Sequence, residues 1–309
     1  MNTQQYIKLI VALMDRREWS KALNVSNKLL DKDKDCTHVY FLIGMCLKHS
    51  NDIEGAKDNF NLCIKQDTNH FLSYINLIRI LKDQKNITET ERLINIAKDL
   101  FPNKALIYIE SSQLYMIQNN TDLAIVEIKI AIILEPKSES AHYTYGVILN
   151  ELFNNSTNDD EFEEYYKKTL IQYMNVFSIN MSNTNALCNY GAVVAKYADK
   201  CNTKANLLLE ESKVLLDENR LKESNDKKEK AIEYYMYAYQ YNIEAETKYK
   251  CALELNPFDH ISHFNLGLIL KYFDNIKKAR YHFNKAIAIN PSYTEAANEL
   301  KLLEEVINV

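Results

Sequence analysis

Residues 265–291 read NLGLILKYFDNIKKARYHFNKAIAINP, and five small, aromatic and proline residues in this stretch have a distinctive spacing along the sequence. They are Gly267, Ala279, Phe283, Ala286 and Pro291, so the last four follow the glycine at offsets of 12, 16, 19 and 24. The stretch contains no obvious catalytic residue. Its spacing therefore calls for a structural explanation.

The same spacing recurs along the chain with a period of 34, interrupted by two longer intervals. The column that contains Gly267 also contains Ile10, Gly44, Ile78, Ser112, Gly146 and Gly191. Once the longer intervals are allowed for, offsets 12 and 19 hold mostly small residues, and offset 16 holds mostly bulky ones. All four prolines of the chain, Pro102, Pro136, Pro257 and Pro291, then stand at offset 24. A period of this length is typical of repeated helix pairs.

These columns resemble those of the tetratricopeptide repeat (TPR) family over essentially the whole chain. The resemblance implies an all-α fold, a right-handed superhelical solenoid of antiparallel helix pairs. The columns of small residues are expected to let the backbones of paired helices approach each other. The column of bulky residues is expected to fill the wedge between neighbouring units, and the prolines are expected to end the second helices. The low content of five Gly and four Pro in 309 residues also predicts an almost wholly helical chain.

The register predicts one domain over residues 1–309, with seven units and a capping helix. The units are expected at 3–36, 37–70, 71–104, 105–138, 139–183, 184–259 and 260–293, and the capping helix at 294–309. A single helix pair cannot bury its apolar face alone, so we expect the array to fold cooperatively.

Two units are longer than the period. The fifth unit has 11 extra residues, which the turn-forming segment 154–160 (NNSTNDD) predicts as a surface loop. The sixth has 42 extra residues, placed at about 198–242, and predicts an inserted helical hairpin. Its helices are expected at about 203–221 and 228–255, separated by a hydrophilic break, KESNDKKEK. Tyr235 and Tyr239 fall on a separate face, which either contacts a partner or is covered by the inserted helix.

In this family, the first helices of successive units line a concave face. The resemblance places Asn76, Asn189 and Asn265 there, where a carboxamide can both donate to and accept from a peptide backbone. Arg79 lies one turn from Asn76. The alternative for the three asparagines is ordinary polar surface without a ligand. The resemblance also implies an apolar floor, made of Phe41, Ile75, Ile109, Tyr143 and Phe264.

The carboxylate clamp with which some members bind chaperone tails is not supported here. Such a clamp requires several cations that converge on a terminal carboxylate. Around Asn76 and Arg79, the corresponding positions are Phe41, Met45, Leu106 and Glu110, none of which is a cation.

The sequence does not predict an enzyme, a cofactor or a metal site. It has no Gly-rich phosphate loop and no recognised catalytic motif. His260, His263 and His282 could be read as metal ligands, but His263 occupies a packing column, which favours a structural role. The acidic run 159–164 is better interpreted as the start of a helix than as a calcium loop.

The charge and the cysteine content of the chain indicate which partners and which cellular compartment to expect. A formal net charge of -5 without a basic patch argues against nucleic acid as a ligand. Six cysteines without a CxxC pair are typical of reduced thiols and predict a cytoplasmic location. No apolar run is long enough to span a membrane, and residues 7–14 are expected to be a helix of the mature protein rather than a signal peptide.

We therefore expect a non-catalytic adaptor that binds an extended segment of a partner protein in its concave groove. The alternative is a scaffold subunit of a larger assembly, of the ubiquitin-ligase or ciliary-transport kind. Such a subunit would contact its partners through outer surfaces and the insertion at about 198–242. The sequence leaves self-association open.

Overall fold

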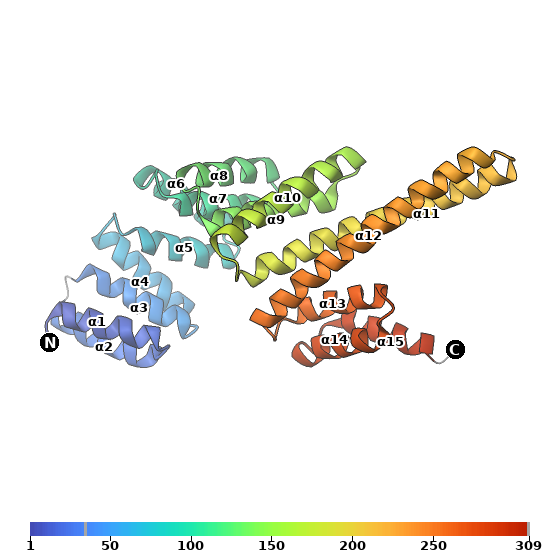
Figure 1. The fold of residues 1–309 in the computed structure, drawn as a ribbon. Coiled ribbons are helices and arrows are strands. Elements are labelled where there is room, and N and C mark those ends of the chain that lie inside the picture. The colour runs from blue at the N-terminus through green and yellow to red at the C-terminus, as the bar shows by residue number, and fades with distance from the viewer. Residues whose placement is uncertain (34–35, 308–309) are drawn as a thin grey trace. The chain divides into compact units, whose positions relative to one another are not determined.

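The computed structural model describes residues 1–33 and 36–307, and these residues form fifteen helices joined by short turns (Figure 1). The described residues contain no strand, as the sequence predicts. Internal contacts divide the chain into two compact units, Met1–Lys137 and Ser138–Val309, which we call the N-terminal and C-terminal units. That the whole chain folds cooperatively as one domain stays a prediction, and the two units are described separately.

The N-terminal unit is made of four antiparallel helix pairs. Its helices are α1 (Thr3–Asp15), α2 (Trp19–Lys32), α3 (Thr37–His49), α4 (Ile53–Gln66), α5 (Phe71–Asp83), α6 (Ile87–Leu100), α7 (Ala105–Ile117) and α8 (Thr121–Leu134). First helices have 13 residues and second helices have 14; three residues form the turn within each pair, and four residues separate one pair from the next. These lengths account for the period. First helices also contact each other, α1 with α3 and α5 with α7, as expected of a solenoid.

The C-terminal unit continues the pattern with helices of different lengths. They are α9 (Glu139–Asn155), α10 (Asp159–Ile179), α11 (Thr184–Asp217), α12 (Leu221–Leu255), α13 (His260–Tyr272), α14 (Ile276–Ile289) and α15 (Thr294–Ile307). Helix α15 packs against α14 in the place of the expected capping helix. Positions 308 and 309 of that helix lie outside the described residues. The acidic run does begin a helix, since Asp159, Asp160 and Glu161 form the first turn of α10.

The glycine column is explained by the aromatic column. A Cβ atom built on Gly44, Gly146, Gly191 or Gly267 would stand 2.5 to 2.9 Å from a ring atom of Phe60, Tyr173, Tyr249 or Phe283, respectively. Each ring comes from the second helix of the same pair. The expectation that the bulky column fills the wedge between units therefore needs correction, because these four rings fill the space above the glycine within one unit. The same contact occurs in helix pairs before and after both long intervals.

The fifth unit is longer because both of its helices are longer. Helix α9 has 17 residues and α10 has 21, while the turn between them is still three residues, 156–158. The expected loop at 154–160 is therefore too long, since positions 154, 155, 159 and 160 are helical. Asn158 ends the turn by accepting a hydrogen bond at its side chain from the backbone N–H of Glu161, at 2.8 Å.

The sixth unit contains the expected helical hairpin, but without the expected break. Helix α11 has 34 residues and α12 has 35, so each is three heptads longer than in a regular unit, and residues 218–220 join them. The segment at 203–221 is mostly the end of α11, and KESNDKKEK lies inside α12. Figure 1 shows this pair, in yellow and orange, extending well beyond the ends of α13 and α14. We call residues 198–242 the hairpin extension.

Small buried residues at intervals of seven explain why the two helices continue unbroken. The seam is formed by Gly191, Ala198, Ala205 and Ser212 on α11, and by Ser224, Ala231, Ala238 and Ala245 on α12. Near the tip, the Ser212 hydroxyl donates to the Ser224 carbonyl and the Ser224 hydroxyl donates to the Ser212 carbonyl, both at 2.9 Å. A seven-residue repeat keeps one seam between paired helices. Polar residues of KESNDKKEK other than Ser224 can therefore face solvent while the helix continues.

Candidate protein-binding surfaces

In the N-terminal unit, the expected groove residues are largely engaged by the protein itself. Phe41, Ile75 and Ile109 are buried in the packed helices and present little surface to a ligand. The Asn76 side chain donates to the Leu72 carbonyl at 3.0 Å and accepts from the Lys48 ammonium at 3.2 Å. These contacts engage the carboxamide that, from the sequence, we expect to bind a peptide backbone.

Arg79 belongs to a buried ion cluster that the repeat pattern does not reveal. Its Nε donates to Glu110 Oε1 at 2.6 Å, and Lys82 Nζ donates to Glu110 Oε2 at 2.5 Å. Glu110 is 2% exposed, and the same ammonium also donates to Gln113 at 2.5 Å. The cluster ties α5 to α7, so Arg79 is already committed to a carboxylate of its own chain.

In the C-terminal unit, the expected groove residues are more accessible. Tyr143, Asn189, Phe264 and Asn265 are all half-buried. Asn189 Nδ2 donates to the Tyr143 hydroxyl at 3.3 Å, which links α11 to α9. The Phe264 ring packs against Phe283 and Tyr293, with centroids 5.9 and 5.2 Å away. Asn265 makes no side-chain hydrogen bond with the residues that the structure describes.

A buried thiol joins the two helices that carry Asn189 and Asn265. Cys188 of α11 donates to the carboxylate of Asp259, the N-cap of α13, at 3.1 Å and also contacts the Ser262 hydroxyl. Burial raises the pKa of the Cys188 thiol to about 12. The thiol is therefore a packing and hydrogen-bonding group rather than a nucleophile.

The two tyrosines expected on the hairpin differ in their surroundings. The Tyr235 hydroxyl donates to Asn206 of α11 at 2.5 Å, so the neighbouring helix partly covers this residue. Tyr239 is 53% exposed, and its ring meets Phe273, at the end of α13, with centroids 5.3 Å apart. The inserted helix therefore covers one tyrosine and leaves the other largely open.

The extra residues of the fifth unit support the base of the hairpin extension. Phe153 and Phe162, both in the added turns, pack against each other with their rings tilted by 39° and their centroids 4.3 Å apart. Next to them, Tyr166 stacks on Tyr197 of α11 at 4.0 Å, and Tyr197 meets Tyr241 of α12 at 5.0 Å. The lengthened α9–α10 pair and the lengthened α11–α12 pair thus share one aromatic cluster.

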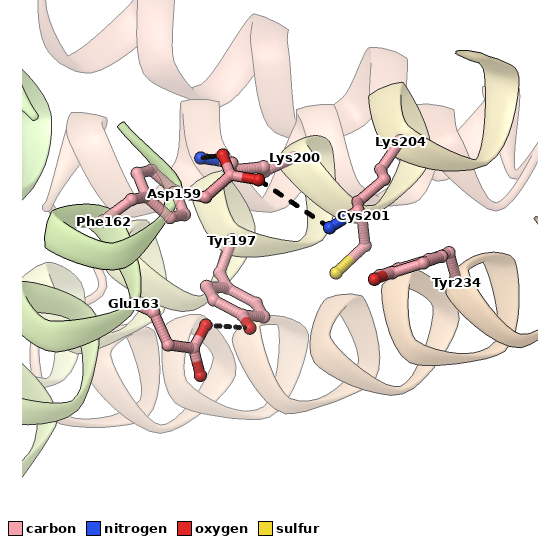
Figure 2. Close-up of a pocket in the computed structure, with 8 residues that line it drawn as sticks. All are labelled: Asp159, Phe162, Glu163, Tyr197, Lys200, Cys201, Lys204 and Tyr234. Atoms are coloured by element: carbon pink, nitrogen blue, oxygen red, sulfur yellow. Dashed lines mark hydrogen bonds and ion pairs between the residues drawn. The ribbon is translucent and has the colours of Figure 1, made fainter. Parts of the chain in front are cut away.

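A small pocket of about 130 Å³ lies beside this cluster (Figure 2). Figure 2 shows Asp159 reaching Lys200 and Lys204, at 2.7 and 3.7 Å, and the Tyr197 hydroxyl meeting Glu163. Lys200 also lies 3.9 Å from the centroid of Phe162. Burial raises the pKa of the Cys201 thiol in its wall to about 11. The charged groups are paired with each other, so we interpret the pocket as part of the hairpin's support.

Two histidines form a neutral pair between α13 and α14. His263 Nε2 lies 3.2 Å from the Pro257 carbonyl, which can only accept, so this nitrogen donates. Its Nδ1 must then accept from His282 Nδ1, 2.9 Å away. Burial, followed by the proximity of His263, Lys250 and Lys278, lowers the pKa of His282 to about 4. Within the described residues, no group of three or more His, Cys, Asp or Glu side chains is placed to hold a metal.

We expect the protein to lose stability as the pH falls from about 6.5 to about 4, partly because of this pair. The pKa of His282 is lower in the folded than in the unfolded chain, so acid protonates the unfolded chain first and favours unfolding. The loss should be on the order of 1 kcal/mol for a ring that solvent partly reaches. Urea unfolding at several pH values measures it. His282→Gln should make the pH dependence shallower, and an unchanged slope would contradict the assignment.

None of the helices in the described residues combines the length and apolarity needed to cross a membrane. A family model described as "Tetratricopeptide repeat" matches residues 37–70 and 261–293, which are the second and seventh units. No curated protein matches the sequence.

Solved structures match the fold at low sequence identity. A chain of the crystal structure of the APC/C hetero-tetramer Cut9-Hcn1 matches with a TM-score of 0.67 and 16% identity. That match covers 95% of this chain and 48% of the other, so this chain spans about half of its length. A tetratricopeptide repeat protein from Parabacteroides merdae ATCC 43184 matches with a TM-score of 0.59 and 10% identity over 98% of each chain. The human IFIT1 dimer with m7Gppp-AAAA matches with a TM-score of 0.52 and 11% identity, over 94% of this chain and 72% of the other.

Proposed function

Because the chain is a tetratricopeptide repeat protein, we propose that it is a non-catalytic adaptor that binds an extended segment of another protein. The segment would lie along the first helices of the C-terminal unit. There, Asn189 and Asn265 would bind its backbone, and Tyr143 and Phe264 would contact its side chains. The free thiols of the chain fit a reducing, cytoplasmic setting.

The observation that carries this proposal is the state of Asn265. Its carboxamide is half-buried beside Phe264, yet makes no hydrogen bond with the described residues. A carboxamide can donate to a carbonyl and accept from an N–H of the same peptide. In the N-terminal unit, by contrast, Asn76 already forms two such bonds with its own chain. The C-terminal unit is therefore the better place for a peptide.

A phage library of random linear peptides, selected on the full chain, tests this proposal. We expect enriched peptides, remade synthetically, to bind the wild type and to lose about tenfold in affinity to Asn265→Ala, since two hydrogen bonds would be removed. Asn284→Ala is the matched control, because this exposed carboxamide of α14 only donates to the Arg280 carbonyl of its own helix. The groove would be rejected if no peptide were enriched. It would also be rejected if the Asn265→Ala and Asn189→Ala variants both bound the peptides as tightly as the wild type does.

The hairpin extension favours a second candidate, a scaffold subunit of a larger assembly. Regular units need no such projection, and here it is supported by eleven added residues in the preceding unit. The Cut9-Hcn1 structure, whose chain this one resembles in fold, is itself a hetero-tetramer. Shortening α11 and α12 by three heptads each, which keeps the turn and the seam spacing, should remove partners under this second function and leave peptide binding intact.

A further inference from the structure

We infer that the Tyr173 hydroxyl binds a backbone carbonyl of the partner segment, so that a residue of the packed interior is part of the peptide site. This inference rests on the proposed function, because it concerns the same site on the C-terminal unit. Tyr173 belongs to α10, a second helix, and its ring lies against Gly146 of α9. The side chain is fully buried, yet its hydroxyl has no hydrogen-bond partner among the described residues.

The packing of the unit does not need this hydroxyl. In the second and seventh units, the ring that lies against the column glycine is Phe60 or Phe283, which fills the same space without an oxygen. A buried hydroxyl without a partner costs free energy, since water solvates it in the unfolded chain. Nearly all buried polar groups of native proteins are hydrogen-bonded. The exception at Tyr173, where phenylalanine would pack equally well, therefore points to a partner from outside the chain.

The hydroxyl lies beside two of the expected groove residues, one from each neighbouring first helix. The ring centroids of Tyr143, on α9, and Tyr173 are 6.4 Å apart. Burial and the proximity of Tyr143 raise the pKa of Tyr173, and the carboxamide of Asn189, on α11, opposes part of this rise. Asn189 Nδ2 also donates to the Tyr143 hydroxyl, at 3.3 Å. Polar groups from α9, α10 and α11 are therefore gathered at one place in the proposed peptide site.

This cluster has donors to offer and lacks an acceptor. Burial raises the pKa values of Tyr143 and Tyr173, so both phenols keep their protons at neutral pH. The Tyr143 oxygen already accepts from Asn189, which leaves its hydrogen to be donated. The Tyr173 hydrogen has no acceptor in the described part of the chain. A ligand atom that accepts hydrogen bonds would satisfy both phenols.

An amide carbonyl fits this cluster better than a carboxylate does. The groups that shift the pKa values of the two phenols, besides burial, are Asn189, Cys188 and Tyr143, and none of these is a cation. A carboxylate buried without a cation is costly, whereas a carbonyl is neutral. An extended segment presents one backbone carbonyl per residue. We therefore expect Tyr173 to add affinity and to fix the position of the segment, and not to select its side chains.

A side-chain rotation gives access to the buried hydroxyl. Its polar neighbours, Tyr143 and Asn189, are only half-buried and reach solvent. The hydrogen bond between them is 3.3 Å long, slightly beyond the usual range, and is correspondingly weak. Rotation of the Asn189 side chain opens this bond and frees its carboxamide for the backbone of the segment. Binding thus replaces one weak internal bond with bonds to the ligand.

Tyr173→Phe tests the inference, with Tyr190→Phe as the matched control. The probe is a synthetic copy of a linear peptide that is enriched on the wild-type chain. Tyr173→Phe should bind it about three- to tenfold more weakly, because a hydrogen bond is lost, while its urea midpoint stays equal to or above that of the wild type. Tyr190 is also buried, but its hydroxyl donates to Glu244 at 2.5 Å. Tyr190→Phe should therefore lower the urea midpoint and leave the affinity unchanged.

Substitution in the peptide backbone identifies the atom that the hydroxyl contacts. Each carbonyl of the probe is replaced in turn by a thiocarbonyl, which is a weaker hydrogen-bond acceptor. At one position, the replacement should weaken binding to the wild type and have little effect on binding to Tyr173→Phe. Such coupling between a protein group and a ligand group shows that the two interact.

Three results would overturn the inference and leave the proposed function in place, provided that Asn265→Ala still weakens binding. The first is wild-type affinity in Tyr173→Phe. The second is a fall in its urea midpoint as large as that of Tyr190→Phe, which would mean that the hydroxyl is satisfied in the free protein. The third is a thiocarbonyl effect that is the same in both proteins at every position. A library that enriches no peptide would reject the proposed function and this inference together.

Discussion

Glu110→Gln is expected to lower the free energy of unfolding by about 3 to 5 kcal/mol, the range for breaking a buried ion pair by removing one partner. The carboxylate is 2% exposed and accepts from Arg79 and from Lys82, whose side chain is itself 10% exposed. Glutamine keeps the shape and one acceptor but removes the charge. The Lys82 ammonium then stays in a nearly dry site without a counter-charge. Arg79, 43% exposed, can turn to water and contributes less to the loss.

Urea unfolding at neutral pH measures this loss, and two further variants identify its cause. Glu89→Gln removes an equivalent charge from the exposed pair with Arg92, and should change stability by less than about 0.5 kcal/mol. Glu110→Leu combined with Lys82→Met replaces the charges by apolar groups of similar size and should recover most of the loss. A cost for Glu110→Gln no larger than that for Glu89→Gln would mean that the cluster is solvated.

This ion cluster also shows what the repeat pattern can and cannot predict. Glu110 stands two positions before the column residue Ser112, where the resemblance suggests a ligand-binding side chain. Which residue it meets depends on side chains about 30 positions away, on the neighbouring first helix. Local spacing does not identify such a partner. The packing columns, in contrast, are predictable, because each unit repeats the same contact between its own two helices.

The hairpin extension was only partly predictable for a related reason. The sequence locates the 42 extra residues and indicates helices among them, but KESNDKKEK suggests a break. Only Ser224 of that segment is buried in the seam, and a single small residue in every seven is enough to continue the helix pair. Most of the nine residues of KESNDKKEK occupy solvent-facing positions of the helix, which are free to be polar. The overall composition of the segment therefore reflects these positions and not the seam. The decisive residues are the widely spaced Ser224, Ala231 and Ala238.

The paired columns contain a further regularity that bears on stability. Where the first column holds glycine, the residue that meets it is Phe or Tyr, as for Gly267 and Phe283. Where the first column holds a larger residue, the matching residue is aliphatic or small, as for Ile78 and Ile94. A larger residue in the first column is therefore accompanied by a second residue smaller than Phe or Tyr, as close packing requires.

Gly267→Ala should consequently destabilise the protein by about 1 to 3 kcal/mol, although alanine is the better helix former by about 1 kcal/mol. The new Cβ would lie 2.5 Å from Cε1 of Phe283, a fully buried ring that cannot move aside freely. Steric overlap therefore outweighs helix propensity.

Phe283→Leu alone should also be costly, because it leaves a cavity above the glycine. Together, the two substitutions reproduce the kind of pairing that the chain uses at Ile78 and Ile94, so their combined cost should be smaller than the sum of the single costs by about 1 kcal/mol or more. A double-mutant cycle in urea measures this coupling, and additive costs would show that the ring does not restrict the column to glycine.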